Sequence, residues 1–293
     1  FRRKEVGSMS TTGKLVLGTA QFGMNYGINN ASGQVTPKEV NEILIEAGKC
    51  GVGYIDTAYG YGNSEEVLGN SEALHYYPFK VISKYAKNSL TPLEQYDASL
   101  KRLKVDKLYA YMVHNFPTYK NNPEIWDEFL ELKGSGKVER IGFSLYSPAE
   151  LEYILDYNLE ADIIQVPYNI LDRQFEAWFP LLKEKGIEVH TRSAFLQGLF
   201  FKRIETFDGN ISPLAKYVEQ IQQYCQHNDI HIQDLALGYV LSSQADGVLI
   251  GVDSLEQLRK NIQSAERQMT EEDFDFIRSV DVLEKKLLSP VNW

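Results

Sequence analysis

The chain of 293 residues has little cysteine, no long apolar segment and no excess of positive charge. Its two cysteines, Cys50 and Cys225, cannot form the disulfide framework that stabilises small secreted domains. We therefore expect both thiols to be reduced and structural, and the protein to be cytoplasmic. No apolar run approaches the ~20 residues that a membrane span requires. The net charge of -10 argues against nonspecific binding to nucleic acid or to anionic membranes.

Two common nucleotide-binding motifs are also absent. No G-x-G-x-x-G follows an expected strand, and no G-x-x-x-x-G-K-[ST] occurs anywhere in the chain. The sequence therefore gives no sign of a Rossmann domain or of a P-loop, and it suggests no metal site. Residues 1–8, which end in Gly-Ser before Met9, resemble an expression-tag remnant. We expect residues 9–293 to form one domain.

Short apolar runs alternate with amphipathic segments along the rest of the chain. The expected strands cover 14–19, 52–55, 79–84, 107–114, 140–143, 162–165, 187–191 and 247–250. The expected helices cover 36–49 (capped by Thr36), 93–101, 125–132, 148–157, 173–185 (despite Pro180), 211–225, 232–241, 255–262 and 270–280. A long loop spans 20–33. Eight strand–helix units with extra C-terminal helices predict a parallel (β/α)8 TIM barrel, an α/β fold.

The segment from Gly51 to Gly69 combines several of these signals. A short apolar run ends at Asp56, and a loop rich in Gly and Tyr follows. Asn63 and Ser64 then precede two glutamates, which predicts a helix that is capped by Asn or Ser and has acids in its first turn. In a parallel barrel, active residues lie where the strands end, so this segment is a candidate for the active site.

Four residues at successive strand ends form the candidate catalytic group: Asp56, Tyr61, Lys84 and His114. Taken singly, each has an ordinary explanation as a turn cap, a packed ring, a surface lysine or a core histidine. Together they suit proton transfer to a carbonyl oxygen. A nearby lysine would lower the pKa of a tyrosine and make it a usable acid and base. An aspartate would hold the lysine, and a neutral histidine would orient the carbonyl group.

The chain resembles the aldo-keto reductase family from Lys14 to Val280. Asp56-Thr-Ala-x-x-Tyr61, followed by Gly-Asn-Ser-Glu and then by Lys84 and His114, is similar to the catalytic tetrad of that family. The resemblance implies a (β/α)8 barrel that binds a nicotinamide cofactor without a Rossmann domain. It also implies that Tyr61 is the acid and base, that Lys84 and Asp56 tune it, and that His114 orients the substrate.

Later segments resemble the family's cofactor-binding motifs, with departures at Leu145, Arg192 and Asp253. Gly142-Phe-Ser144 resembles G-[VI]-S-N, although Leu145 replaces the Asn. A Tyr that usually stacks on the nicotinamide ring is replaced by Arg192, which we expect to contact the cofactor or, alternatively, to pair with an acid. The cofactor-binding residues that the resemblance implies are Ser144, Gln165, Arg192, Ser193, Leu196, Gly198, Gly251, Asp253, Gln257 and Asn261.

Asp253 bears on the choice of cofactor. It stands where many family members have an Arg that binds the 2′-phosphate of NADPH. A carboxylate repels a phosphate but accepts hydrogen bonds from a ribose hydroxyl, which favours NAD(H). Ser254 or Arg259 could instead serve a phosphate. The resemblance favours NADP(H), and NAD(H) is the alternative.

We therefore expect an NAD(P)(H)-dependent oxidoreductase that interconverts a small-molecule carbonyl compound, such as an aldehyde, a ketone or a sugar derivative, and an alcohol. The expected substrate pocket comprises Phe22, Tyr26, Tyr59, Tyr85, Asn115 and Phe116, with Tyr146 as a further candidate. A cofactor-binding regulatory or redox-sensing subunit with little turnover is one alternative. A barrel aldolase that forms a Schiff base on Lys84 is another. Neither the oligomeric state nor the identity of the substrate follows from the sequence.

Overall fold

The computed structural model describes residues 11–27 and 33–293. The tag remnant expected at residues 1–8 lies outside these residues. The described part of the chain contains eight parallel strands, which close into a barrel in sequence order. The strands are β1 (Leu15–Gly18), β2 (Tyr54–Asp56), β3 (Lys80–Tyr85), β4 (Leu108–Val113), β5 (Val138–Ser144), β6 (Ile163–Pro167), β7 (Glu188–Arg192) and β8 (Gly247–Gly251).

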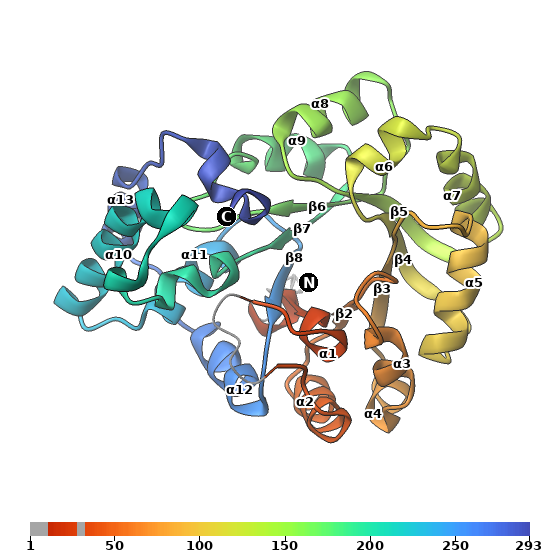
Figure 1. Ribbon diagram of the computed structural model, residues 1–293, viewed down its shortest axis with the longest axis horizontal. Coiled ribbons are helices and arrows are strands. Elements are labelled where there is room, and N and C mark those ends of the chain that lie inside the picture. Colours follow the sequence, from red (N-terminus) through yellow and green to blue (C-terminus); the bar gives the residue numbers. More distant parts are fainter. Residues whose placement is uncertain (1–10, 28–32) are drawn as a thin grey trace, which may run out of the picture.

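Each strand pairs in parallel with the next, and β1 also pairs with β8, which closes the barrel. The strands occupy the middle of the molecule, with helices around them (Figure 1). The fold is therefore the (β/α)8 barrel that the sequence predicts. Because all strands run the same way, their carboxyl ends meet at one edge, where residues from distant parts of the sequence come together.

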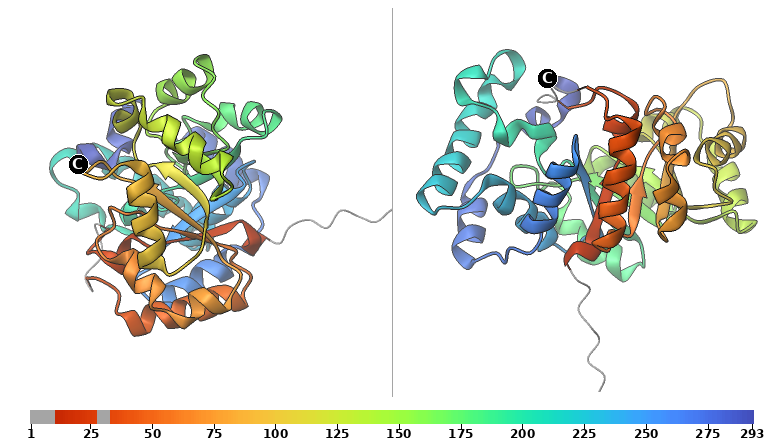
Figure 2. Two further views of the ribbon diagram at one scale, coloured as in Figure 1. Left: turned by 90° about the vertical axis from the view of Figure 1, so that its right-hand side faces the viewer. Right: turned by 90° about the horizontal axis from the view of Figure 1, so that it is seen from below.

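The helices follow the strands on the outside, as two further views confirm (Figure 2). The α-helices are α1 (Ala20–Gly23), α2 (Pro37–Lys49), α3 (Ser64–Gly69), α4 (Glu72–Tyr76), α5 (Pro92–Leu103), α6 (Phe116–Asn121), α7 (Ile125–Gly134), α8 (Pro148–Asp156), α9 (Phe179–Glu184), α10 (Ala215–His227), α11 (Ile232–Leu241), α12 (Leu255–Ser264) and α13 (Glu271–Ser279). The 3₁₀ helices are η1 (Thr11–Lys14), η2 (Glu176–Trp178), η3 (Leu196–Phe201), η4 (Ile204–Thr206), η5 (Gly209–Leu214), η6 (Lys285–Leu288) and η7 (Pro290–Asn292).

Proline explains two helices that begin later than the sequence predicts. The expected helix over 173–185 is wrong, because only η2 and α9 form and Pro180 lies in the first turn of α9. Proline fits there because the first helical N–H groups have no partner within the helix. In the same way, Pro213 lies in η5, and α10 begins two residues after it.

The loops next to the candidate site also differ from expectation. The expected loop over 20–33 begins with the short helix α1, and residues 28–32 of that loop lie outside the described residues. Thr36 caps α2 as predicted, because its Oγ1 accepts a hydrogen bond from the Glu39 backbone N–H. Asn63 stands at the cap position of α3 but makes no capping bond; its Oδ1 accepts instead from Gln34.

Apolar side chains fill the layer between strands and helices and continue inside the barrel. Cys225 is buried in that layer and Cys50 ends α2; both thiols are free, as predicted. Across residues 11–27 and 33–293, no helix is long and apolar enough to cross a membrane. Within the same ranges, no group of three or more His, Cys, Asp or Glu side chains could hold a metal ion.

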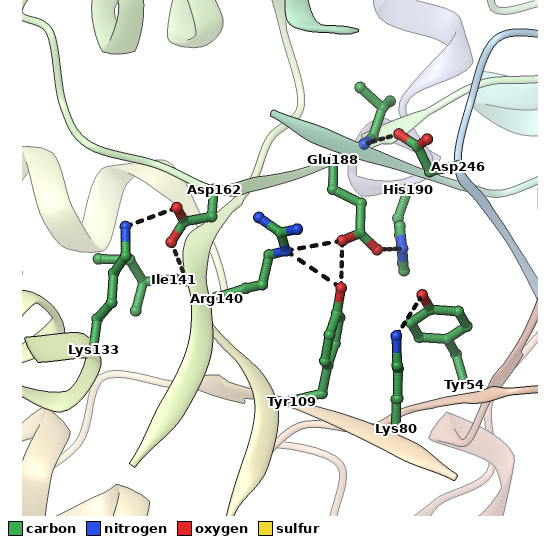
Figure 3. Close-up of polar contacts among 11 residues, drawn as sticks. Tyr54, Lys80, Tyr109, Lys133, Arg140, Ile141, Asp162, Glu188, His190 and Asp246 are labelled. Atoms are coloured by element: carbon green, nitrogen blue, oxygen red, sulfur yellow. Dashed lines mark hydrogen bonds and ion pairs between the residues drawn. The ribbon is translucent and has the colours of Figure 1, made fainter. Parts of the chain in front are cut away.

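A polar network closes the amino-terminal end of the barrel, away from the candidate site (Figure 3). Glu188 lies at its centre, accepting hydrogen bonds from the Tyr109 hydroxyl at 2.6 Å and pairing with Arg140 at 3.2 Å. The other carboxylate oxygen lies 2.7 Å from Nε2 of His190, which is fully buried. In a (β/α)8 barrel this end contributes stability rather than chemistry.

Candidate active site

Three neighbouring strands carry three of the four expected catalytic residues to one edge of the barrel. Asp56 is the last residue of β2, Lys84 is the penultimate residue of β3, and His114 directly follows β4. Tyr61 lies in the loop between β2 and α3. The backbone N–H of His114 donates to the carbonyl oxygen of Tyr85, which continues the β3–β4 pairing to the histidine. The arrangement follows directly from parallel pairing, which aligns strand ends.

Lys84 and Asp56 form a buried ion pair beneath the site. The Lys84 Nζ lies 2.5 Å from Asp56 Oδ1, and both side chains are 1% exposed. Nζ also donates to the Thr57 carbonyl oxygen at 2.9 Å, while Gln165 donates to Asp56 Oδ2 at 2.9 Å. Burial lowers the pKa of Lys84, and the charge of Asp56 opposes that change. The pair is therefore held in place by a third strand, β6, which supplies Gln165.

Tyr61 and His114 lie against each other above this pair. Their ring centroids are 5.3 Å apart in an edge-to-face contact, and the Lys84 Nζ lies 5.4 Å from the Tyr61 ring centroid. Burial lowers the pKa of His114 to about 3, and the charges of Lys84 and Arg192 add to the effect. The imidazole is therefore neutral at physiological pH and presents one donor and one acceptor.

The electrostatics of Tyr61 correct one expectation. We expected the lysine to lower the pKa of this tyrosine, but burial raises the pKa and the charge of Asp56 raises it further. The Lys84 ammonium group is bonded to Asp56 and Thr57 and does not reverse this rise. The phenol of Tyr61 therefore keeps its proton through the neutral range.

Close backbone contacts fix the position of Tyr61. A Cβ atom added to Gly23 in α1 would lie 1.8 Å from the Tyr61 carbonyl oxygen, so only glycine allows this approach. Ser64, at the start of α3, donates from its Oγ to the Thr19 carbonyl oxygen at 2.9 Å. The β1–α1 and β2–α3 connections are thereby locked together, and Tyr61 is held between them.

A cavity of about 570 Å³ opens at this end of the barrel. Thirteen of the expected site residues line it: Tyr26, Asp56, Tyr61, His114, Ser144, Gln165, Arg192, Ser193, Gly198, Gly251, Asp253, Gln257 and Asn261. Tyr146, the further candidate, lines it too. Lys84 lies beneath Asp56 and does not line the cavity, and Leu196 is 1% exposed and packs in the core.

Most of the expected substrate pocket lies elsewhere, and that part of the prediction is wrong. Phe22 is fully buried, and Phe116 packs against Phe143 and Tyr153 in the core. The Tyr85 hydroxyl donates to the Leu90 carbonyl oxygen, because Tyr85 points to the opposite face of β3 from Lys84.

Two further pocket predictions fail because the side chains have structural partners. The Tyr59 hydroxyl accepts from Arg102 in α5 at 3.0 Å, and the guanidinium lies 4.0 Å from its ring centroid. Asn115 caps α6, since its Oδ1 accepts from the Thr118 backbone N–H at 3.1 Å. None of the five mispredicted side chains faces the cavity.

The cavity also has lining residues that the sequence did not single out. They include Thr19, Gln21, Phe195, Phe201, Gln233 and Lys260. Gln233 lies in the first turn of α11 and donates to Asn261 Oδ1 at 2.5 Å. Among these residues, only Gln21 lies in a segment that the sequence marked as unusual, the long loop over 20–33.

Asp253 marks one end of the cavity. Its backbone N–H donates to Gln257 Oε1 at 2.8 Å, and Gln257 returns a 3.4 Å contact from its Nε2 to Asp253 Oδ2. The second carboxylate oxygen, Oδ1, is buried without a hydrogen-bond partner among the described residues. Burial raises the pKa of Asp253, and the bond from Gln257 opposes this. An orphaned acceptor lining a cavity fits a ligand that supplies a hydroxyl donor.

The segment after β7 lines the cavity in a strained conformation. Ser193, Leu196 and Gln197 have φ values of 64°, 47° and 54°, and Gly198 has 90°. Non-glycine residues rarely adopt positive φ, and such conformations cluster at ligand sites. Gln197 donates to the Tyr26 hydroxyl at 3.0 Å, which joins this segment to the first connection.

Comparison with known proteins identifies the family. A model of the Aldo/keto reductase family matches residues 14–282. The chain belongs to this family.

Individual relatives agree with this assignment. The chain is 30% identical over 284 residues to the NADH-specific methylglyoxal reductase of Escherichia coli (strain K12), covering 82% of this chain and 86% of that protein. It is 28% identical over 313 residues to the uncharacterized oxidoreductase YqkF of Bacillus subtilis (strain 168), with 91% and 95% covered. The holo form of aldo-keto reductase AKR11C1 from Bacillus halodurans superposes with a TM-score of 0.75 at 23% identity, covering 91% of each chain, which supports the fold.

This aldo-keto reductase is therefore an NAD(P)H-dependent oxidoreductase. The residues present fit such a cofactor: polar side chains line the cavity, among them Ser144, Gln165, Asp253 and Asn261. Asp253 Oδ1 adds a specific point of fit, because this buried acceptor could receive a hydrogen bond from a ribose hydroxyl of the cofactor.

Proposed function

We propose that the protein reduces the carbonyl group of a small aldehyde or ketone, with Tyr61 as the proton donor. One observation carries the proposal. Tyr61 and His114 lie in contact at the cavity, directly above the buried Lys84–Asp56 pair. This is the arrangement needed to place one carbonyl oxygen within reach of a phenol and a neutral imidazole.

Each of the four residues has a distinct task in the proposal. A nicotinamide cofactor bound in the cavity would supply hydride to the carbonyl carbon. Tyr61 gives its proton to the developing alkoxide, which is a stronger base than a phenolate, so the raised pKa of Tyr61 does not prevent the transfer. His114, kept neutral by burial, orients the carbonyl oxygen by hydrogen bonding. Lys84, fixed by Asp56, provides positive charge near the phenolate that forms.

The two rivals are less well supported. An aldolase would need the Lys84 amine to reach substrate, whereas Nζ is buried and bonded to Asp56 and Thr57. A regulatory subunit would have no need of a tetrad assembled at the cavity. Tight cofactor binding without turnover on a broad panel of carbonyl compounds would favour that second alternative.

Replacement of Tyr61 by phenylalanine tests the proposal. Tyr61→Phe should leave cofactor affinity unchanged and lower kcat for aldehyde reduction by about 100-fold or more, because the proton donor is lost. Stopped-flow or steady-state loss of NAD(P)H absorbance measures kcat, and fluorescence quenching measures cofactor binding. Tyr59→Phe is the matched control, since the Tyr59 hydroxyl binds Arg102 outside the cavity. Full activity in Tyr61→Phe would remove the basis of the assignment.

We further propose that the enzyme prefers NAD(H), although the resemblance favoured NADP(H). The orphaned Asp253 oxygen suits a ribose hydroxyl and repels a 2′-phosphate. The two residues that the sequence suggested for a phosphate are engaged. Ser254 caps α12 through the Gln257 N–H, and Arg259 pairs with Glu46 at 3.0 Å. A relative described as NADH-specific is consistent with this preference.

Cofactor affinities decide this point. Wild type should bind NADH about tenfold or more tightly than NADPH, and Asp253→Arg should shift the preference toward NADPH by at least a similar factor. Arg259→Met is the control, because its guanidinium pairs with Glu46 and lies outside the cavity lining. An unchanged preference in Asp253→Arg would show that this loop does not contact the ribose.

A further inference from the structure

Arg192 lines the cavity together with Tyr61 and His114, and proton transfer as proposed gives it no task, so a contact with the cofactor and a contact with the substrate are the two roles open to it. It is the last residue of β7, and it shares the inward face of that strand with Glu188 and His190. Burial raises the pKa of Tyr61 and lowers that of His114, and the charge of Arg192 lowers both. Because all three residues line the same cavity, the guanidinium can reach a ligand held there.

The guanidinium is positioned but not neutralised. Its Nη2 donates to the Leu145 carbonyl oxygen at 2.9 Å, and its carbon lies 4.2 Å from the Tyr146 ring centroid. These contacts fix its plane while using one of five N–H donors. Within the described ranges, no carboxylate lies within 4 Å of it, so the alternative that it pairs with an acid is wrong, and the expected contact with the cofactor stays a prediction.

The nearby acids are already committed. Asp56 accepts hydrogen bonds from Lys84 and Gln165. Asp172, whose pKa is raised by burial and lowered by Gln174 and Arg192, accepts from the Gln174 backbone N–H and amide. An arginine held by a backbone carbonyl and an aromatic ring, with open donors beside a cavity, is suited to a planar anion from solution.

We infer that Arg192 determines substrate specificity by binding a carboxylate carried by the carbonyl substrate. This rests on the proposed carbonyl reduction at Tyr61. A carboxylate matches the planar fork of a guanidinium in two parallel bonds and carries the single charge that one unpaired arginine can balance. The mouth above it is rimmed by the partly exposed rings of Tyr26 (40%), Tyr146 (39%) and Phe201 (45%), which suits the carbon skeleton of such a substrate.

The anion that binds Arg192 has a second source, because the pyrophosphate of the cofactor is also negatively charged. The two sources predict different losses when Arg192 is changed. A substrate contact gives a loss of discrimination between charged and uncharged aldehydes. A pyrophosphate contact gives weaker cofactor binding and equal losses for all aldehydes.

Matched substrate pairs test the inference. The pairs are glyoxylate with acetaldehyde, succinic semialdehyde with butanal, and 4-carboxybenzaldehyde with benzaldehyde, so the carboxylate lies at increasing distance from the carbonyl. For at least one pair, the kcat/KM of wild type should be about tenfold or more higher for the charged member than for the uncharged one. This difference should arise from a lower KM. Arg192→Met should bring that ratio close to one, and Arg192→Lys should restore part of it.

Controls separate the outcomes. Arg203→Met should keep the preference, because Arg203 is exposed in the same segment and pairs with Glu205. Thermal unfolding of each variant checks that the Leu145 contact is not needed for folding. A ratio that is the same in wild type and Arg192→Met overturns the inference while leaving carbonyl reduction intact. A tenfold weaker NADH affinity in Arg192→Met with an unchanged ratio also overturns it, in favour of the pyrophosphate. Failure to reduce any aldehyde removes the proposed function, and the inference with it.

Discussion

At the scale of single residues, burial sets the protonation states that the proposed chemistry uses. Tyr61 keeps its proton because its pKa is raised, first by burial and then by Asp56. His114 stays neutral because burial lowers its pKa to about 3. A protonated phenol beside a neutral imidazole is the pair that carbonyl reduction requires, and it persists across the whole neutral range.

This gives a prediction for the pH dependence of reduction. Because His114 titrates near pH 3 and Tyr61 titrates above its ordinary value of about 10, neither group should change charge between about pH 6 and about pH 9. The kcat/KM for an uncharged aldehyde should be flat over that interval in steady-state assays at saturating cofactor. An acidic limb with a midpoint near pH 6.5, the value of an ordinary histidine, would mean that His114 is solvated and charged in the working enzyme.

The assembly of the four candidate residues at one edge of the barrel was predictable because strand ends can be read from the sequence, whereas the lining of the cavity was not. Side-chain direction decides the difference. Lys84 and Tyr85 are adjacent, so they face opposite sides of β3, and only one of them belongs to the site. Asn115 follows His114 but caps α6. Such roles depend on partners three or more residues away, which a reading of strand ends does not supply.

At the scale of elements, the differences between the predicted and the observed helices fall on short helices and on helix starts. The helices α4 and α6 contain five and six residues, too few for a periodic apolar pattern to reveal them. The longer helix α11 was predicted with its observed bounds, Ile232–Leu241. The boundary errors at α9 and α10 both come from prolines, which start helices more readily than they continue them.

One contact between elements bears directly on function. Gly23 in α1 approaches the backbone of Tyr61, so Gly23→Ala must push the β2–α3 loop away. We expect kcat to fall about 10- to 100-fold, because displacing a catalytic group by an ångström costs that much. Thermal or urea unfolding should show a loss of roughly 1–3 kcal/mol.

Gly53→Ala is the matched control for this prediction. Like Gly23, Gly53 lies before Tyr61 in the sequence. A Cβ atom added to Gly53 would meet nothing within 4 Å. Its kcat should equal that of wild type. If Gly23→Ala and Gly53→Ala behave alike, the Gly23 contact does not position Tyr61.

At the scale of the whole molecule, the barrel separates chemistry from stability. The count of strand–helix units was enough to predict the closed parallel barrel, because eight units favour closure over an open sheet. The network around Glu188 could not be predicted in the same way. Tyr109 and Glu188 are 79 residues apart in the sequence and meet only after closure. Nothing local marks either residue as part of a shared hydrogen-bond network.

That network should stabilise the fold in a pH-dependent manner. Burial raises the pKa of Glu188, but bonds from His190 and Tyr109 and the charge of Arg140 outweigh it, so the pKa is lowered. A lowered carboxyl pKa adds stability that is present above the unfolded value of about 4.5 and is lost as pH falls through the folded value. Glu188→Gln should therefore cost roughly 2–3 kcal/mol of unfolding free energy at pH 7 and progressively less below pH ~4.5.

Chemical unfolding at several pH values, alongside kinetics, tests this division of roles. Glu139→Gln removes an exposed pair with Lys107 and should cost less than about 0.5 kcal/mol at any pH. Glu188→Gln should retain wild-type kcat at temperatures where it is folded, because Glu188 begins β7 and Arg192 ends it at the cavity. A large loss of kcat in the folded variant would show that the two ends of the barrel are coupled. A loss of stability that does not change with pH would instead mean that Glu188 acts by packing rather than by charge.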